Sequence, residues 1–98
     1  MTVTKTLEEK VLNVKVEGRL DTATAPALEE ELAEVMDEAE ELVFDLEGLE
    51  YMSSAGLRIL LATQKKMAQK GGMKVVNVND VIKEIFDITG FSDILTIE

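Results

Sequence analysis

Cysteine and histidine are both absent from this sequence of 98 residues. Their absence excludes a disulfide framework, a zinc site built from thiolates or imidazoles, and Ser-His-Asp or Cys-His catalysis, because the metal ligands or the general base are missing. Long apolar runs are absent as well: stretches such as 59–62 extend over only a few residues, so none could span a bilayer. The N-terminus alternates Thr and Val without the pattern of a signal peptide, and we therefore expect a cytoplasmic protein without membrane insertion.

Motifs that bind nucleotides or metals are missing too. The sequence contains neither GxGxxG nor GxxxxGK(S/T), the glycine-rich loops that cradle phosphates. The acidic segment 45–50 does not fit the spacing of an EF-hand. We therefore expect no catalytic activity, no cofactor and no metal site. Ten basic against twenty acidic residues leave a formal charge of −10, which repels phosphate backbones and argues against direct binding to nucleic acid.

Alternating and helical spacings of apolar residues predict eight elements, in the order β-β-α-β-α-β-α-β. The expected strands cover 2–7, 11–17, 42–46, 73–78 and 94–97, and the expected helices cover 26–39, 54–70 and 79–88. The polar link 8–10 predicts an antiparallel hairpin of the first two strands. Strands that alternate with helices predict right-handed crossovers and a mostly parallel sheet. We expect an α/β fold in one domain over 1–98, with the helices packed on the sheet.

Several local expectations complete this picture. Gly18 is expected to end the second strand, with a loop from Arg19, and 47–50 is expected to be a turn. The compact apolar run 42–46 is typical of a central strand buried on both faces. Glutamates between 29 and 38 fall mainly off the apolar stripe of the first helix. We interpret them as a solvated face, and a partner-binding acidic face is the alternative.

The segment 51–58, Tyr-Met-Ser-Ser-Ala-Gly-Leu-Arg, joins the central apolar strand to the longest predicted helix. Ser53 or Ser54 can cap this helix by accepting hydrogen bonds from its free N–H groups. The same position also suits a phosphate, because exposed N–H groups and the positive end of the helix dipole stabilise an anion. Two interpretations follow, a purely structural cap and a phosphorylation site.

Three segments together resemble the STAS domain, specifically the stand-alone anti-sigma factor antagonists of bacteria. The segment 18–21, Gly-Arg-Leu-Asp, is similar to the Gly-x-Leu-Asp loop of that family, and 86–91 is similar to its closing helix and turn. Residues 43–46 and 49–57 resemble the segment that carries its phosphorylation site. The resemblance covers nearly the whole chain in the right order.

The resemblance implies a partner switch. Members of the family bind a serine kinase that is also an anti-sigma factor, and so release the sigma factor. The kinase phosphorylates one serine of the antagonist, which ends binding, and a serine phosphatase restores it. By position, the phosphorylated residue is Ser54. The residues expected to face the partner are Asp21, Thr22, Ser53, Ala55, Gly56, Leu57 and Arg58.

The sequence also departs from the family pattern, which in the sporulation antagonist is Asp-Ser-Ser-Gly. Ser53 stands at the acidic position, and Ala55 replaces the second serine. The change at Ser53 alters what a kinase can recognise and creates a competing hydroxyl. Arg58 stands where a small residue is common and places a cation within one turn of Ser54. It either pairs with a phosphate or is solvated.

Two other functions are compatible with this resemblance. The chain could be a STAS regulatory subunit of a membrane assembly that transports lipids or anions, without any sigma factor. A small-ligand or nucleotide-binding module is the third possibility.

Overall fold

The computed structural model describes all residues from Met1 to Glu98. Its elements are the strands β1 (Thr2–Glu8), β2 (Val11–Leu20), β3 (Glu41–Asp45), β4 (Leu49–Met52) and β5 (Met73–Val76), and the helices α1 (Ala25–Val35), α2 (Ser54–Met67) and α3 (Asp80–Thr89). Two short 3₁₀ helices, η1 (Met36–Glu38) and η2 (Phe91–Asp93), follow α1 and α3. This is the α/β fold predicted from the sequence.

The strands form one sheet in the spatial order β1-β2-β3-β5, and β4 pairs separately with the end of β2. The β1–β2 pair is antiparallel, as predicted, and all other pairs are parallel. Glu9 and Lys10 connect β1 to β2 with φ angles of 49° and 69°, the geometry of a tight two-residue hairpin turn. The hairpin therefore fixes β1 as an edge strand of a mostly parallel sheet.

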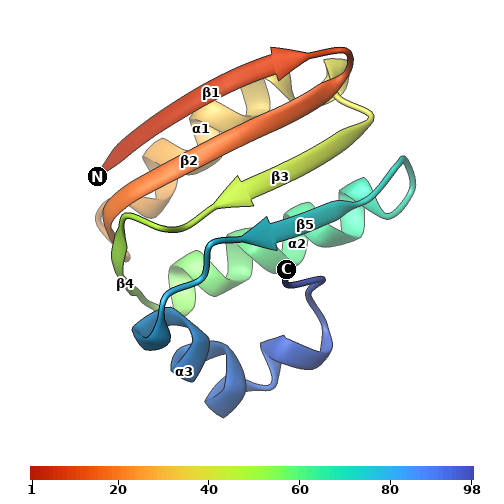
Figure 1. The fold of residues 1–98 in the computed structure, drawn as a ribbon. Coiled ribbons are helices and arrows are strands. Elements are labelled where there is room, and N and C mark those ends of the chain that lie inside the picture. Colours follow the sequence, from red (N-terminus) through yellow and green to blue (C-terminus); the bar gives the residue numbers. More distant parts are fainter.

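Both α1 and α2 lie behind the sheet in Figure 1, and α3 lies beside β4 beyond the edge of the sheet. The centre of the core is a row of neighbouring residues on the helix-facing side of the strands, Val14, Phe44 and Val75, which are completely buried. Lys5 fastens the edge strand β1 to α1 through ion pairs of 2.8 Å with Glu31 and 2.9 Å with Glu34. These contacts hold the sheet and its helices in a fixed arrangement.

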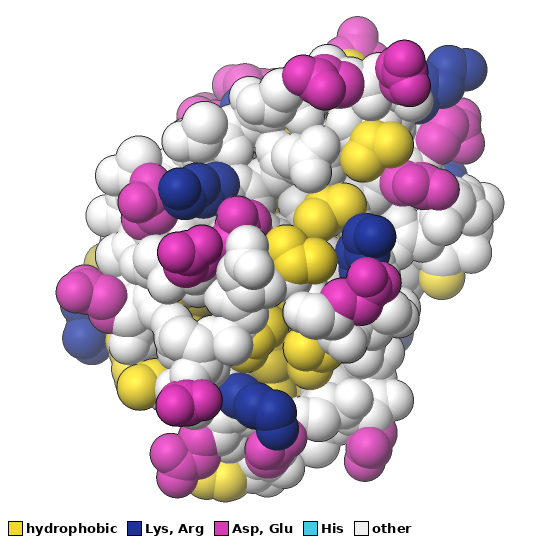
Figure 2. Space-filling view, in the orientation of Figure 1, with side chains coloured by type: hydrophobic (Ala, Val, Ile, Leu, Met, Phe, Trp, Pro, Cys, Tyr) yellow, Lys and Arg dark blue, Asp and Glu magenta, His cyan; other side chains and the backbone are white.

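The opposite face of the sheet carries no helix (Figure 1). Because side chains alternate along a strand, it presents mostly polar groups, such as Thr4, Lys15 and Asp45. The space-filling view of this side shows acidic side chains in excess over scattered lysines and arginines (Figure 2). The expectation that 42–46 is buried on both faces is therefore wrong: Val43 and Asp45 remain half-buried, because no helix covers this side of the sheet.

Two other predictions are wrong near the end of β2. Gly18 does not end the strand: it adopts a φ of +91°, the register shifts there, and pairing continues through Arg19 to Leu20. Residues 49 and 50, expected as the second half of a turn, begin the strand β4, which runs to Met52 alongside this extension. The glycine bends β2 instead of terminating it, because only glycine tolerates this backbone conformation without strain.

Differences at other element ends are smaller. The expected last strand reduces to a single parallel bridge between Val75 and Ile97, after the η2 turn. Helix α1 ends at Val35, α2 at Met67 and β5 at Val76, each a few residues before the predicted end. Gly90 ends α3 with a φ of +82°, in the left-handed conformation that favours glycine.

Candidate functional site

The candidate site lies where β2 and β4 end side by side. Arg19 and Leu20 of β2 are paired with Tyr51 and Met52 of β4, and the backbone N–H of Ser53 donates to the carbonyl of Leu20 at 2.9 Å. The loop that follows β2 and the first turn of α2 therefore start from neighbouring points of one sheet edge. Residues separated by more than thirty positions in the sequence meet here because parallel strands share a carboxyl end.

Asp21 organises the loop after β2. Its Oδ1 accepts hydrogen bonds from the N–H groups of Ala23 and Thr24, at 3.0 and 3.1 Å. The Oγ1 of Thr24 accepts from the N–H of Asp21 and donates to the carbonyl of Arg19, both at 2.9 Å. The hydrogen bond from the Thr24 N–H is the main reason why the pKa of Asp21 lies below its ordinary value. This network presents Thr22 at the exposed tip of a well-defined loop.

The two serines at the start of α2 have different environments. Ser53 is the N-cap: its backbone is extended, and its Oγ accepts a hydrogen bond from the Ala55 N–H at 3.3 Å. Ser54 is the first helical residue, exposed, and no acidic side chain accompanies it in the first turn. The structure thus decides which serine caps the helix, and the capping role falls to Ser53.

Gly56 and Leu57 are buried, in contrast to Ser54. A β-carbon at Gly56 would lie 2.8 Å from Leu20 Cγ and 2.8 Å from Met52 Cγ, which is much closer than carbon atoms normally approach. The missing side chain therefore lets α2 lie directly on the ends of β2 and β4. These two residues set the position of the first turn, whereas Ala55 is half-buried and Arg58 is exposed.

Both arginines of the chain lie at this edge, although acidic residues dominate the composition. The guanidinium of Arg19 stacks over the ring of Tyr51, 4.6 Å from its centroid, and its Nε is 3.9 Å from Asp21 Oδ2. Arg58 has no carboxylate within 4.0 Å. One arginine is thus held in a local cluster and the other is an unpaired cation.

A shallow groove lies on each side of the first turn of α2. The groove toward α1, of ≈ 370 Å³, is lined by Thr22, Pro26, Glu29, Ala55 and Arg58 together with apolar residues of both helices. The groove toward α3, of ≈ 310 Å³, is lined on one side by Tyr51 and Ser54 and on the other by Ile85, Ile88 and Thr89. Every expected partner-facing residue except Gly56 lines one of these grooves or lies in the adjoining loop.

Sequence reasoning missed the contribution of Tyr51 and of α3. Ile88 is 78% exposed and Tyr51 is 37% exposed, so both are large apolar surfaces left open to solvent. The signal was present in the sequence, because Ile88 falls off the face of α3 that buries Ile82 and Phe86. An apolar residue outside the buried stripe of a helix is a candidate contact for a partner.

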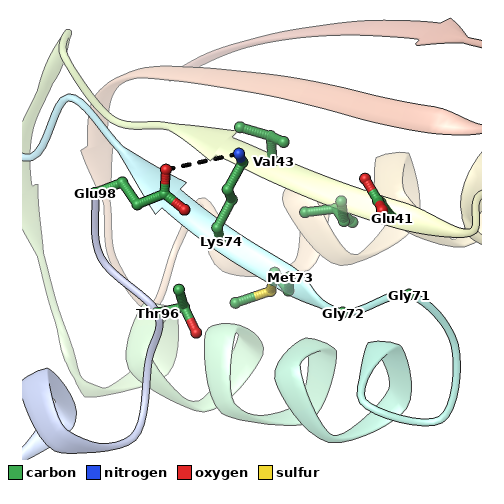
Figure 3. Close-up of a pocket in the computed structure, with 9 residues that line it drawn as sticks. Glu41, Val43, Gly71, Gly72, Met73, Lys74, Thr96 and Glu98 are labelled. Atoms are coloured by element: carbon green, nitrogen blue, oxygen red, sulfur yellow. Dashed lines mark ion pairs between the residues drawn. The ribbon is translucent and has the colours of Figure 1, made fainter.

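Another polar hollow lies at the opposite end of the sheet (Figure 3). It has a volume of ≈ 290 Å³ and is bordered by Glu41, the Gly71–Gly72 turn and the C-terminal residues. Its only ion pair joins Lys74 to Glu98, 3.7 Å apart.

No three potential metal-ligating side chains gather anywhere in the structure. None of its helices combines the length and the apolar character that a membrane span requires.

Comparison with known proteins agrees with this architecture. The model of the STAS domain matches residues 2–98. The anti-sigma-B factor antagonist of Bacillus subtilis is 33% identical over 90 residues, which is 91% of this chain and 83% of that protein. A crystal structure of an anti-sigma factor antagonist from Mycobacterium paratuberculosis has a TM-score of 0.87 and 34% identity, and the match covers 98% of this chain and 83% of the other.

A more distant neighbour shares the fold alone. The Bacillus cell fate determinant SpoIIAA, solved in its phosphorylated form, has a TM-score of 0.76 at 13% identity and covers 99% of this chain and 91% of its own. The family model and the relative from Bacillus subtilis each span most of the chain, including both segments that build the site. The chain belongs to the STAS domain family.

Proposed function

We propose that this protein is a cytoplasmic anti-sigma factor antagonist that acts as a binding switch and not as an enzyme. In its unmodified form it binds an anti-sigma factor that is also a serine kinase. Phosphorylation of Ser54 ends the binding, and a serine phosphatase restores it. The names of the relatives with 33% and 34% identity support this function over a regulatory subunit of a lipid or anion transporter.

The observation that carries the proposal is the position of Ser54. Its hydroxyl is exposed at the first residue of α2 and is not used to cap the helix, because Ser53 fulfils that role. A kinase can therefore transfer the γ-phosphoryl group of ATP to Ser54 Oγ, with release of ADP and the hydroxyl proton, without breaking a structural hydrogen bond. The Ser53 hydroxyl is half-buried and engaged with the Ala55 N–H, which makes it the poorer acceptor.

The surroundings of Ser54 supply a surface for a partner. The two grooves place Ala55 and Arg58 on one side of this serine and Tyr51 and Ile88 on the other. Apolar contacts at the centre of an interface contribute most of its binding energy. A phosphate would add about 1.5 to 2 negative charges to the middle of this surface. A single cation such as Arg58 cannot neutralise all of this charge, and burying the remainder against a partner is strongly unfavourable.

The test is a calorimetric titration that measures the affinity of the anti-sigma factor kinase from the same organism. It is carried out with four forms of the protein: wild type, Ser54→Ala, Ser54→Asp and the phosphorylated protein. Wild type and Ser54→Ala are expected to bind equally within a few-fold. Ser54→Asp is expected to bind at least about tenfold more weakly, which corresponds to about 1.4 kcal/mol, and the phosphorylated protein more weakly still.

Ser53→Ala is the matched control, because it removes the neighbouring hydroxyl and leaves Ser54 in place. After treatment with kinase and ATP, phosphopeptide mass spectrometry should place the phosphate on Ser54 in both wild type and Ser53→Ala. Equal binding by the phosphorylated and unmodified proteins would reduce Ser54 to an ordinary first-turn residue and end the proposal.

A further inference from the structure

We infer that Arg58 holds the phosphate of phosphorylated Ser54 within the molecule, so that the modified state has its own intramolecular ion pair. The inference rests on the proposed phosphorylation of Ser54 and adds a structural role for a residue that departs from the family pattern.

The helical geometry brings the two side chains together. Ser54 and Arg58 are both exposed and four positions apart on α2, a spacing that puts their β-carbons about 5–6 Å from each other. Side chains of a helix lean toward its N-terminus, so the long side chain of Arg58 can reach Ser54, although in the unmodified protein Arg58 lines the groove toward α1 and Ser54 the groove toward α3. A guanidinium can donate two parallel hydrogen bonds to phosphate oxygens.

Nothing in the structure competes strongly for Arg58. It makes no ion pair or side-chain hydrogen bond, although twenty carboxylates are present in the chain. Glu29 of α1 lines the same groove, but lies beyond ion-pair distance of Arg58. Asp21, the other acid nearby, is engaged with backbone N–H groups and with Arg19. The unmodified protein therefore keeps one unpaired cation within a turn of the residue that gains a dianion.

Two consequences follow for the switch. The ion pair favours the doubly charged phosphate, so the second pKa of phosphoserine falls. It also directs the phosphate along α2, beside the groove that contains Thr22 and Ala55, and away from the Ile88 side. Arg58 then has two roles, as part of the neutral binding surface before phosphorylation and as the phosphate partner after it.

The experiment installs phosphoserine at position 54 during translation, so that it depends on neither a kinase nor a binding partner. The second pKa of the phosphate is measured by ³¹P NMR titration in wild type, Arg58→Gln and Arg58→Lys. It is expected to be lower in wild type than in Arg58→Gln by about 0.2–0.4 pH units. Arg58→Lys, which keeps the charge and loses the planar fork, should be intermediate.

Lys65→Gln is the matched control. Lys65 is an exposed lysine of the same helix without an ion pair, and its removal changes the net charge equally. It lies eleven residues from Ser54, about 16 Å along the helix, which is beyond the range of unscreened interactions at about 0.1 M salt. The pKa in Lys65→Gln should therefore match that of wild type.

Equal pKa values in wild type and Arg58→Gln, or equal changes in Arg58→Gln and Lys65→Gln, would overturn the inference. Because the phosphate is installed directly, this result is independent of partner binding. A lowered pKa together with unchanged affinity for the anti-sigma factor would uphold the ion pair and reject the proposed function.

Discussion

The N-termini of α2 and α3 have the same backbone design and opposite electrostatics. Each begins after an extended N-cap residue whose side chain accepts a backbone hydrogen bond, Ser53 in α2 and Asn79 in α3. The first helical residue is Ser54 in α2 and Asp80 in α3. One turn later α2 has Arg58, whereas α3 has the exposed Glu84.

The difference shows what is special about α2. Asp80 gives α3 a permanent negative charge where the helix dipole favours one. Helix α2 has a neutral hydroxyl at the equivalent position and a cation one turn away. Phosphorylation of Ser54 would give α2 the charge that α3 always carries. The proposed switch is thus a helix end that lacks its charge until a kinase adds it.

The largest expected effect concerns the third helical position, where α2 has Gly56 and α3 has Ile82. Both residues are buried. Ile82 packs into the core with its side chain, whereas Gly56 has no side chain and so allows Leu20 and Met52 to pack against the helix backbone. Gly56→Val should lower the free energy of unfolding by about 1–3 kcal/mol, as overpacking of a buried site does. Urea unfolding of wild type, Gly56→Ala and Gly56→Val should show a progressive loss of stability. If Gly56→Val leaves the free energy of unfolding unchanged, α2 does not pack on the sheet edge as described.

The two N-caps should differ in strength. Asn79 accepts from the Ile82 N–H at 3.0 Å and also donates to the Leu49 carbonyl at 2.7 Å, whereas Ser53 makes one bond of 3.3 Å. We expect Asn79→Ala to cost about 1–2 kcal/mol and Ser53→Ala about 0.5–1 kcal/mol. Thermal and urea unfolding of the two variants would check this ranking, and the reverse order would contradict the comparison.

A feature of this site could be predicted from the sequence when it depends on residues that are close together along the chain. Features that depend on residues far apart in the sequence could not be predicted. A serine cap at the start of α2 was predictable, because a cap depends on a few neighbouring residues, but the sequence left open whether Ser53 or Ser54 supplies it. The strand β4 was not predicted, because its four residues pair only with the end of β2, which is about thirty residues away in the sequence. The close approach at Gly56 was equally hidden, as it depends on where Leu20 and Met52 lie in space.

Charge at the first helical position is expected to have a smaller effect than the caps. Ser54→Asp should stabilise α2 by about 0.3–1 kcal/mol at low salt, and Asp80→Ser should destabilise α3 by a similar amount. The two changes give each helix the type of residue that the other has in the native chain. Unfolding midpoints measured at low and high salt would test both, with each difference shrinking as salt screens the charge. A gain that persists unchanged in high salt would point to another cause.

The smallest effect is a pH dependence at the loop beside α2. The pKa of Asp21 is lowered chiefly by the Thr24 N–H, so its contribution to stability is present above the ordinary pKa of 3.8 and is lost as the pH falls through the lower value of the folded state. Asp21→Asn keeps an oxygen acceptor but does not titrate. The difference in unfolding midpoint between wild type and Asp21→Asn should be constant near neutral pH and shrink below about pH 4. A difference that grows toward acid pH would show that the sign is wrong.

The helix-free face of the sheet offers a position for a fluorescent label that reports partner binding. Thr4 lies exposed on that face in the middle of β1, with Lys15 of β2 as its neighbour. Since the chain contains no cysteine, Thr4→Cys introduces a unique thiol that a fluorescent dye can modify without a second reaction site. Helices α1 and α2 lie on the other side of the sheet, so the label would leave both grooves beside Ser54 open. Energy transfer from this dye to a second dye on the partner would then report binding.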